Sequence, residues 1–433
     1  MNDKQNNNDI AITGMAASFA GVGNLHDCWH HIIDRKKFVG GVGNSPETVH
    51  VEPRQKINGD YHQEALSLPI IRAAFDDAGY LKRPLDEKIS VLISLSRSSS
   101  SSLIDKPEAE IKLQPTLAQI AEVLGLTSRN TVVVKDFTSS LLAIKAAMDE
   151  LLARTCDVAL AGGVYGCAPH SFTNHQGLTP QLGAIPFAAP TNETLANQCG
   201  GIIVLKRLAD AQQDNDRVYA VLKNVSIFEH DSAGPLADAD HEGAIHALKN
   251  AYQKSGIEPD SLALIDASAT GLPFVSRHEI QLLSSLFGTR RSQLPRCALG
   301  SVKAIIGDQG RTTVGVAGLI KAALALHYKI LPPAINDELE PPAQIEKTPF
   351  YLNTEARAWI HGSRENPRRA GVYDFAPRAT SAHAILEEYR ENAAQETKLP
   401  NSLWPVELLC FSGDSLAELL SQIDEVQTFI REN

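Results

Sequence analysis

The segment from residue 132 to residue 164, VVVKDFTSSLLAIKAAMDELLARTCDVALAGGV, constrains the fold more than any other part of the sequence. It begins with a run of β-branched residues, continues with residues that favour helix, and ends in an apolar run with two glycines. This order predicts a strand, a sharp turn into a helix, and a second strand. Phe137 lies in the turn, directly before the predicted helix.

Short apolar strands alternate with helices along the rest of the chain. The predicted strands are segments 10–15, 91–94, 131–134, 200–208, 217–228, 262–269, 297–302, 370–376 and 382–389. Besides the helix that follows Phe137, the predicted helices are segments 242–255, 277–287 and 315–330. Two similar halves of this kind indicate an α/β protein with stacked helix and sheet layers. We expect one core, spanning residues 9–390.

The two ends of the chain differ from this core in composition. Residues 1–8 are polar and are expected to form a disordered leader. Residues 391–433 begin with a polar, proline-containing stretch and then predict a strand and a helix, with an N-cap at Ser412 or Asp414. We interpret 391–433 as a linker that leads onward, so that the chain is a piece of a longer polypeptide.

Composition excludes several classes of function. The formal net charge is −11 and no run of Lys and Arg offers a stripe for phosphates, so nucleic acid and anionic membranes are poor partners. No uncharged apolar stretch reaches the roughly 18 residues that a membrane span needs. The N-terminus does not resemble a signal peptide, and a cytoplasmic location is expected.

The cysteines do not suggest a metal site or a disulfide framework, because they are scattered and show no CxxC spacing. They are Cys28, Cys156, Cys167, Cys199, Cys297 and Cys410. The sequence also lacks the phosphate-binding GxxxxGK[ST] motif and the dinucleotide-binding GxGxxG pattern. We therefore expect neither a metal nor a cofactor.

Four blocks of the sequence, in order and separation, resemble the β-ketoacyl synthase domains of polyketide and fatty-acid synthases. The blocks are IAITGM, SSLLAIKAAMDELLARTCDVALAGGV, GSVKAIIGDQG…GVAGLIKAALAL and AGVYDFAPRATSAHAILEE, and the likeness spans residues 9 to about 390. It implies a thiolase-like fold, with two pseudo-symmetric halves in a five-layered α-β-α-β-α core, and a dimer. Residues 391–433 resemble the linker that joins such a domain to a following acyltransferase.

The resemblance also identifies the positions where the family keeps its catalytic residues. Family members use a Cys–His–His set: the cysteine at a helix N-terminus takes the acyl chain from a thioester, and the histidines stabilise the enolate formed by decarboxylation. In this chain Phe137 of VKDFTSSL occupies the position of the family's cysteine. Ser268 of DASATGL and Asp308 of GSVKAIIGD stand at the two histidines. Lys303 of GSVK is retained.

These substitutions predict that condensation is absent. Phe137 has no nucleophilic atom, so acyl loading there is chemically excluded. Ser268 cannot hold a positive charge. Asp308 adds a negative charge where one develops, which at about 4 Å and an effective dielectric near 20 costs about 4 kcal/mol, or roughly a thousandfold in rate.

Other residues near these positions are also altered or remain candidates. The family's glycine-rich gating loop is replaced by FAPRATSAH, which contains Ala376, Pro377, Arg378 and Ala379, and the proline should restrict its motion. His383 follows in the same stretch and is expected to be structural. Lys303 is expected to form a buried ion pair with Asp308 or a neighbour, or else to meet a phosphopantetheine-borne group.

Two functions stay open. The first is a catalytically degenerate ketosynthase-like domain that acts as a structural or interaction partner, either as a scaffold for an acyltransferase or as a chain-length-factor-type partner of an active ketosynthase. Its expected partners are those domains and the acyl carrier protein of a polyunsaturated fatty-acid or polyketide synthase, in a homo- or heterodimer. The alternative is an active acyltransferase or hydrolase with a relocated nucleophile, such as Cys167 or Ser139.

Overall fold

The structure is a computed structural model that divides the chain into two units, Met1–Tyr389 and Arg390–Asn433. Each unit is described by itself. The residues described are 8–19, 22–35, 63–82, 87–95, 114–126, 132–137, 139–165, 199–229, 238–267, 273–288, 296–303, 312–334, 345–360, 367–375, 380–390, 411 and 415–432.

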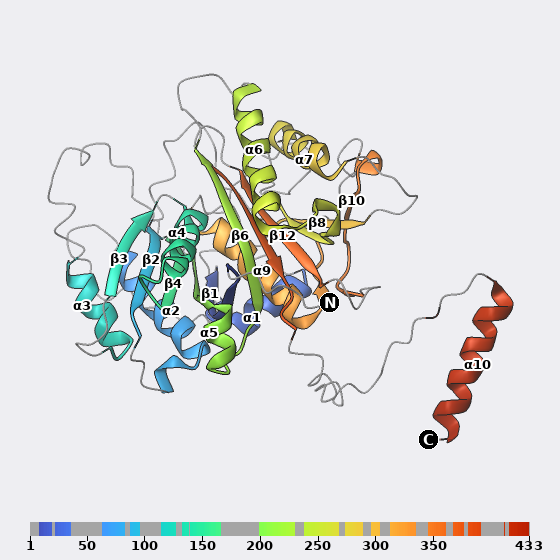
Figure 1. Cartoon of the computed structure of the whole chain (residues 1–433), viewed down its shortest axis with the longest axis horizontal. Coiled ribbons are helices and arrows are strands. Elements are labelled where there is room, and N and C mark those ends of the chain that lie inside the picture. The colour runs from blue at the N-terminus through green and yellow to red at the C-terminus, as the bar shows by residue number, and fades with distance from the viewer. Residues whose placement is uncertain are drawn as a thin grey trace, which may run out of the picture. The chain divides into compact units, whose positions relative to one another are not determined.

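The first unit alternates strands and helices through two halves of the chain (Figure 1). The first half contains β1 (Ile10–Phe19), α1 (Leu25–Ile33), α2 (Gln63–Asp77), β2 (Ile89–Leu95), α3 (Gln114–Val123), β3 (Val132–Phe137), α4 (Ser140–Leu152), β4 (Val158–Tyr165), β5 (Cys199–Arg207) and α5 (Leu208–Gln213). The second half contains β6 (Ala220–Glu229), α6 (Asp238–Ser255), β7 (Leu264–Asp266), α7 (Pro273–Phe287), β8 (Cys297–Gly300), α9 (Val314–Tyr328), β9 (Ile330–Leu331), β10 (Phe350–Leu352), β11 (Arg357–Ala358), β12 (Arg369–Phe375) and β13 (Thr380–Glu387).

The two halves have the same strand order. Eleven strands form one sheet in the order β10-β8-β7-β12-β13-β6-β1-β5-β4-β2-β3, while β9 and β11 form a separate pair. Strands β1-β5-β4-β2-β3 of the first half correspond to β6-β13-β12-β7-β8 of the second, with parallel and antiparallel pairs in the same places. The halves meet where residues 10–12 of β1 pair antiparallel with residues 220–222 of β6. This repeat confirms the expected pseudo-symmetry.

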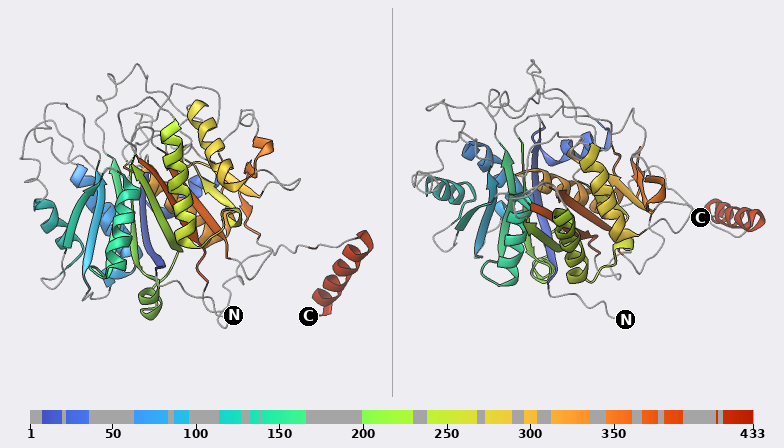
Figure 2. Two further views of the ribbon diagram at one scale, coloured as in Figure 1. Left: turned by 45° about the horizontal axis from the view of Figure 1, so that its top comes forward. Right: turned by 90° about the horizontal axis from the view of Figure 1, so that it is seen from above.

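Helices form three layers around these two half-sheets. Helix α2 packs on β1, β4 and β5, and α6 packs on β6 and β13, so each covers an outer face. Helices α4 and α9 contact each other and strands of both halves, which places them in the central layer. In both views of Figure 2, α2 and α3 (blue to cyan) lie toward the left, whereas α6 (yellow-green) lies near the middle and α7 (gold) farther to the right. The five-layered core predicted from the resemblance is confirmed.

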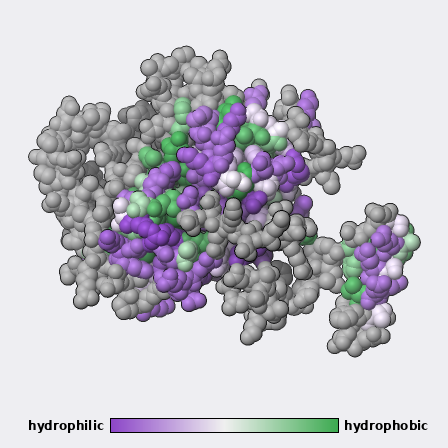
Figure 3. All heavy atoms as spheres, viewed as in Figure 1, coloured by the Kyte–Doolittle hydropathy of each residue, from purple (hydrophilic) through white to green (hydrophobic). Residues whose placement is uncertain are grey.

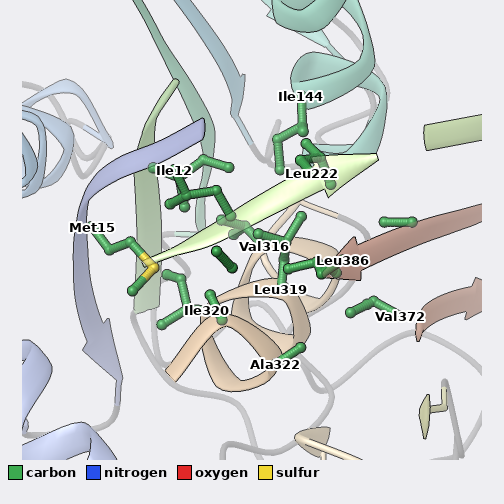
Figure 4. Close-up of a cluster of buried hydrophobic side chains, with 14 of the residues drawn as sticks. Ile12, Met15, Ile144, Leu222, Val316, Leu319, Ile320, Ala322, Val372 and Leu386 are labelled. Carbon is green, nitrogen blue, oxygen red and sulfur yellow. The ribbon is translucent and has the colours of Figure 1, made fainter. Parts of the chain in front are cut away.

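The largest group of buried apolar residues lies in this central layer. Figure 4 shows Ile144 of α4 and Val316, Leu319 and Ile320 of α9 among residues from β1, β6, β12 and β13. Every residue from 314 to 326 in α9 is buried, so this helix is apolar on all sides, as a central helix must be. Lys321 is the one charged residue within that stretch.

The element types predicted from apolar runs are confirmed, whereas several helices were missed. The nine strand segments given above and the second strand of segment 132–164 overlap observed strands, and the predicted helices of the core correspond to α4, α6, α7 and α9. The strand predicted within 391–433 lies outside the described residues. Helices α1, α2, α3 and α5 were not predicted. The helix α2 contains Pro69 in its interior, a residue that normally argues against helix.

The second unit contains helix α10 (Leu416–Glu432). The predicted N-cap at Ser412 or Asp414 is wrong, because the hydroxyl of Ser415 accepts the hydrogen bond from the Glu418 backbone N–H at 3.3 Å. Hydrophilic and hydrophobic residues of this helix lie side by side on the face shown in Figure 3, and Leu416 is 73% exposed. The assignment of 391–433 as a linker stays a prediction. Within the described residues, no helix is long and apolar enough to cross a membrane.

Candidate functional site

The candidate site begins where β3 ends. Phe137 is the last residue of β3, and its backbone lies opposite that of Ser94 in the parallel strand β2. Ser139 then caps α4 in an extended conformation, and the helix starts at Ser140. The strand and the helix predicted for this segment are confirmed, but Phe137 ends the strand instead of lying in the turn, three residues before the first residue of α4. The side chain of Phe137 lies outside the described part of the structure.

The N-termini of α4 and α9 meet at this point. The hydroxyl of Ser140 accepts a hydrogen bond of 3.1 Å from the backbone N–H of Val316, in the first turn of α9. The N-cap residues of the two helices, Ser139 and Thr313, make no side-chain capping hydrogen bond of their own. Ser140 therefore supplies to α9 the acceptor that an N-cap residue normally provides, and it links the two halves of the fold.

Two glycines make this close approach possible. A Cβ atom at Gly163, at the end of β4, would lie 1.5 Å from the carbonyl oxygen of Thr312. A Cβ atom at Gly315 would lie 2.5 Å from the side chain of Leu141. Because real Cβ atoms do not approach other atoms this closely, the meeting of α4 with the start of α9 requires glycine at Gly163 and favours it strongly at Gly315.

The site positions of the second half are partly described. Ser268, Asp308 and the altered gating loop 376–379 lie outside the described residues. Lys303 is buried just after β8, and its backbone N–H donates to the Ser301 hydroxyl at 3.3 Å. The predicted ion pair between Lys303 and Asp308 therefore stays a prediction.

A buried ion pair that was not predicted from the sequence lies between the end of β7 and α9. The ammonium group of Lys321 in α9 lies 2.6 Å from a carboxylate oxygen of Asp266 at the end of β7, and both side chains are less than 5% exposed. The second carboxylate oxygen accepts the backbone N–H of Val302 at 3.3 Å. The pair thus ties α9 to the ends of β7 and β8, which lead to Ser268 and Lys303. A single lysine in a helix that is otherwise apolar was the signal that could have revealed it.

His383 does not point toward α4. Its ring lies on the outer face of β13, where Nε2 and the Tyr252 hydroxyl of α6 are 3.0 Å apart. Complete burial lowers the pKa of His383 to about 3, so the ring is neutral at pH 7. These contacts agree with the structural role predicted for it.

The remaining candidate nucleophiles have no activating partner that the structure describes. Ser139 and Ser140 are buried, and the Ser140 hydroxyl is engaged with α9. Cys167 and the side chain of Cys199 lie outside the described residues. Among the residues that are described, no group of three or more His, Cys, Asp and Glu side chains could hold a metal ion. The geometry supports helix–helix packing at this place rather than a nucleophile with its base.

Family models match both halves of the chain. The model of the β-ketoacyl synthase N-terminal domain matches residues 45–211, and that of the C-terminal domain matches residues 219–338. Polyketide synthase PksN of Bacillus subtilis (strain 168) is 31% identical over 384 residues, which cover 83% of this chain and 7% of that protein. One chain of the polyunsaturated fatty acid synthase of Thraustochytrium sp. is 32% identical over 317 residues, which cover 70% of this chain and 11% of that protein. The chain thus spans about a tenth of the length of these relatives.

Solved structures of ketosynthases share the fold. The ketosynthase from module 6 of the bacillaene synthase of Bacillus subtilis 168, as a C167S mutant, aligns with a TM-score of 0.74 and 25% identity, covering 89% of this chain and 72% of that one. An oxazolomycin ketosynthase domain of Streptomyces albus aligns with a TM-score of 0.65 and 25% identity, covering 87% of this chain and 95% of that one. The repeated halves, the central helices and these matches together show that the chain belongs to the β-ketoacyl synthase family and has its thiolase-like fold.

Proposed function

We propose that this chain is a ketosynthase-like domain of a polyketide or polyunsaturated fatty-acid synthase that does not catalyse condensation and serves as a structural or interaction partner. The observation that carries the proposal is Phe137. It stands at the family's nucleophile position, at the end of β3 and just before the central helix α4. An aromatic ring cannot attack a thioester, so the first chemical step of the family reaction has no nucleophile at this position.

The neighbouring residues support the same proposal. The Ser140 hydroxyl accepts a hydrogen bond from α9, and His383 faces the outer helix α6, away from α4. A serine without a base is a poor nucleophile at neutral pH. Ser268 and Asp308 replace the two histidines by residues that cannot stabilise an enolate with a positive charge.

The partners follow from the family and from the relatives. Those relatives are multidomain synthases about ten times longer than this chain. We propose that the domain contacts a following acyltransferase, an active ketosynthase and the acyl carrier protein of the same synthase, as part of a homo- or heterodimer in the cytoplasm. Helices α4 and α9 pack closely against each other, which supports a role that depends on the folded domain and not on catalysis.

The proposal is tested by incubating the protein with malonyl and acyl thioesters of the carrier protein and following intact mass and release of carbon dioxide. We expect neither an adduct nor carbon dioxide above the background without protein. An adduct would favour the alternative, an acyltransferase or hydrolase with a relocated nucleophile. The Cys167→Ala and Ser139→Ala variants would then identify the acylated residue.

The scaffold role needs a separate experiment. The chain is expressed together with the acyltransferase and ketosynthase domains of its own synthase, and complexes are detected by size-exclusion chromatography with light scattering. We expect a complex with at least one of the two domains. Absence of both complexes at micromolar concentration would contradict an interaction role, even if the chain proved inactive.

A further inference from the structure

Two histidines on helix α1 form a cluster that the proposed function does not use. His26 and His30 are four residues apart, so they lie on one face of the helix, and both are exposed. Their ring centroids are 4.3 Å apart. The opposite face of α1 is buried through Cys28, Trp29 and Ile32, which fixes the helix against the core and directs the two imidazoles to solvent.

The helix that carries the pair is capped at its N-terminus and packed against α9 near its centre. The Asn24 side chain caps its N-terminus by accepting the Asp27 backbone N–H at 2.8 Å. Trp29 stacks on Tyr328 at the end of α9, with ring centroids 5.5 Å apart. The two histidines therefore start from a fixed spacing, and only their side-chain rotations must adjust when a ligand binds.

The ring nitrogens of the pair remain available for ligation. In the part of the chain that is described, no hydrogen bond or ion pair engages the ring of His26 or His30. The next histidine differs, because Nδ1 of His31 lies 2.9 Å from the Asp27 carbonyl oxygen. Neutral imidazole is a strong ligand for zinc, copper and nickel, and two histidines at this helical spacing can hold one ion between them.

We propose that His26 and His30 form a binding site for a divalent transition-metal ion of the zinc, nickel or copper class. The two imidazoles supply two ligands, and water or a group from another molecule completes the coordination. Such a site exchanges its ion more readily than a closed four-ligand site does.

The test is isothermal titration calorimetry, in which Ni²⁺ or Zn²⁺ is added to protein without an affinity tag. Each of His26→Gln and His30→Gln should weaken one binding event about tenfold or more, since each removes one of two protein ligands. The matched control is His246→Gln, which removes an exposed helical histidine whose neighbour at the same spacing is Asn250. It should leave that event unchanged. Equal isotherms for the native protein and the His26→Gln/His30→Gln double variant would overturn the proposal.

A second measurement places the ion, because the chain has 14 histidines. Diethyl pyrocarbonate modification is mapped by peptide mass spectrometry with and without Zn²⁺. We expect zinc to slow modification of His26 and His30 and to leave His246 unaffected. Equal rates with and without zinc at both His26 and His30 would refute the site, whatever the calorimetry shows.

Discussion

Removal of one partner of the Asp266–Lys321 pair should destabilise the domain far more than removal of both. The two charged groups lie 2.6 Å apart and both side chains are almost fully buried. Lys321→Met keeps the side-chain volume but leaves a carboxylate in the core without its cation, which costs about 3–5 kcal/mol. Asp266→Asn leaves the Lys321 ammonium equally uncompensated, so a similar loss is expected.

The double variant Asp266→Asn/Lys321→Met separates the ion pair from the packing around it. The asparagine oxygen can still accept the Val302 N–H that the carboxylate accepts now, at 3.3 Å. No buried charge remains, so we expect the double variant to lie within about 2 kcal/mol of the native protein. The coupling energy between the two sites should therefore be several kcal/mol.

Urea denaturation measures these differences, with the midpoint reporting stability and an unchanged slope reporting an unchanged folded state. The reasoning requires that the double variant be more stable than either single variant. If the losses of the two single variants simply add in the double variant, the two groups do not act as a pair and the argument is refuted.

Three further predictions concern buried contacts. Burial lowers the pKa of His383 to about 3, so the unfolded chain binds a proton below pH 6.5 more readily than the folded protein does. The free energy of unfolding should therefore fall by about 2 kcal/mol between pH 7 and pH 5 because of this residue. The His383→Gln variant should flatten that part of the stability–pH curve. Gly163→Ala should prevent native packing, because its Cβ would lie 1.5 Å from the Thr312 oxygen, and circular dichroism melts should show the loss. Ser140→Ala should cost about 1–3 kcal/mol in urea denaturation, because the Val316 N–H loses its acceptor in the core.

Each of these predictions has a control. The control for His383→Gln is His246→Gln, which removes an exposed histidine and should change stability at pH 7 by no more than about 0.5 kcal/mol. Gly256→Ala places a Cβ in open space at φ +65°, so it should cost about 1 kcal/mol, far less than Gly163→Ala. Thr155→Ala removes an exposed hydroxyl, which donates to the Glu150 carbonyl oxygen at 3.0 Å, and should stay within about 0.5 kcal/mol of the native protein. A control as damaging as its partner variant would contradict the assigned cause.

The sequence predicted the layers of the fold well because apolar runs report burial directly. The run at 132–134 and the glycines at 162–163 mark β3 and β4, and the apolar stretch 314–326 marks a helix buried on all sides. Helix α2 was not predicted, because Pro69 lowers the local preference for helix and its packing on three strands overrides that preference.

Contacts between distant residues could not be predicted in the same way. Asp266 and Lys321 are 55 residues apart, and only the fold brings β7 against α9. Ser140 and Val316 meet across the pseudo-symmetric halves, and no local pattern encodes that hydrogen bond. The order of the family motifs predicted which residues belong to the candidate site, whereas only the structure shows how the helices around it pack.

The Phe137→Cys variant tests whether the absence of a nucleophile at this position is what prevents acyl loading. Intact mass is measured after incubation of the native protein and the variant with an acyl thioester, and condensation is followed with malonyl carrier protein. We expect no adduct on the native protein, an adduct on the variant, and no condensation by either, because Ser268 and Asp308 remain. An acyl adduct or carbon dioxide release with the native protein would contradict this expectation.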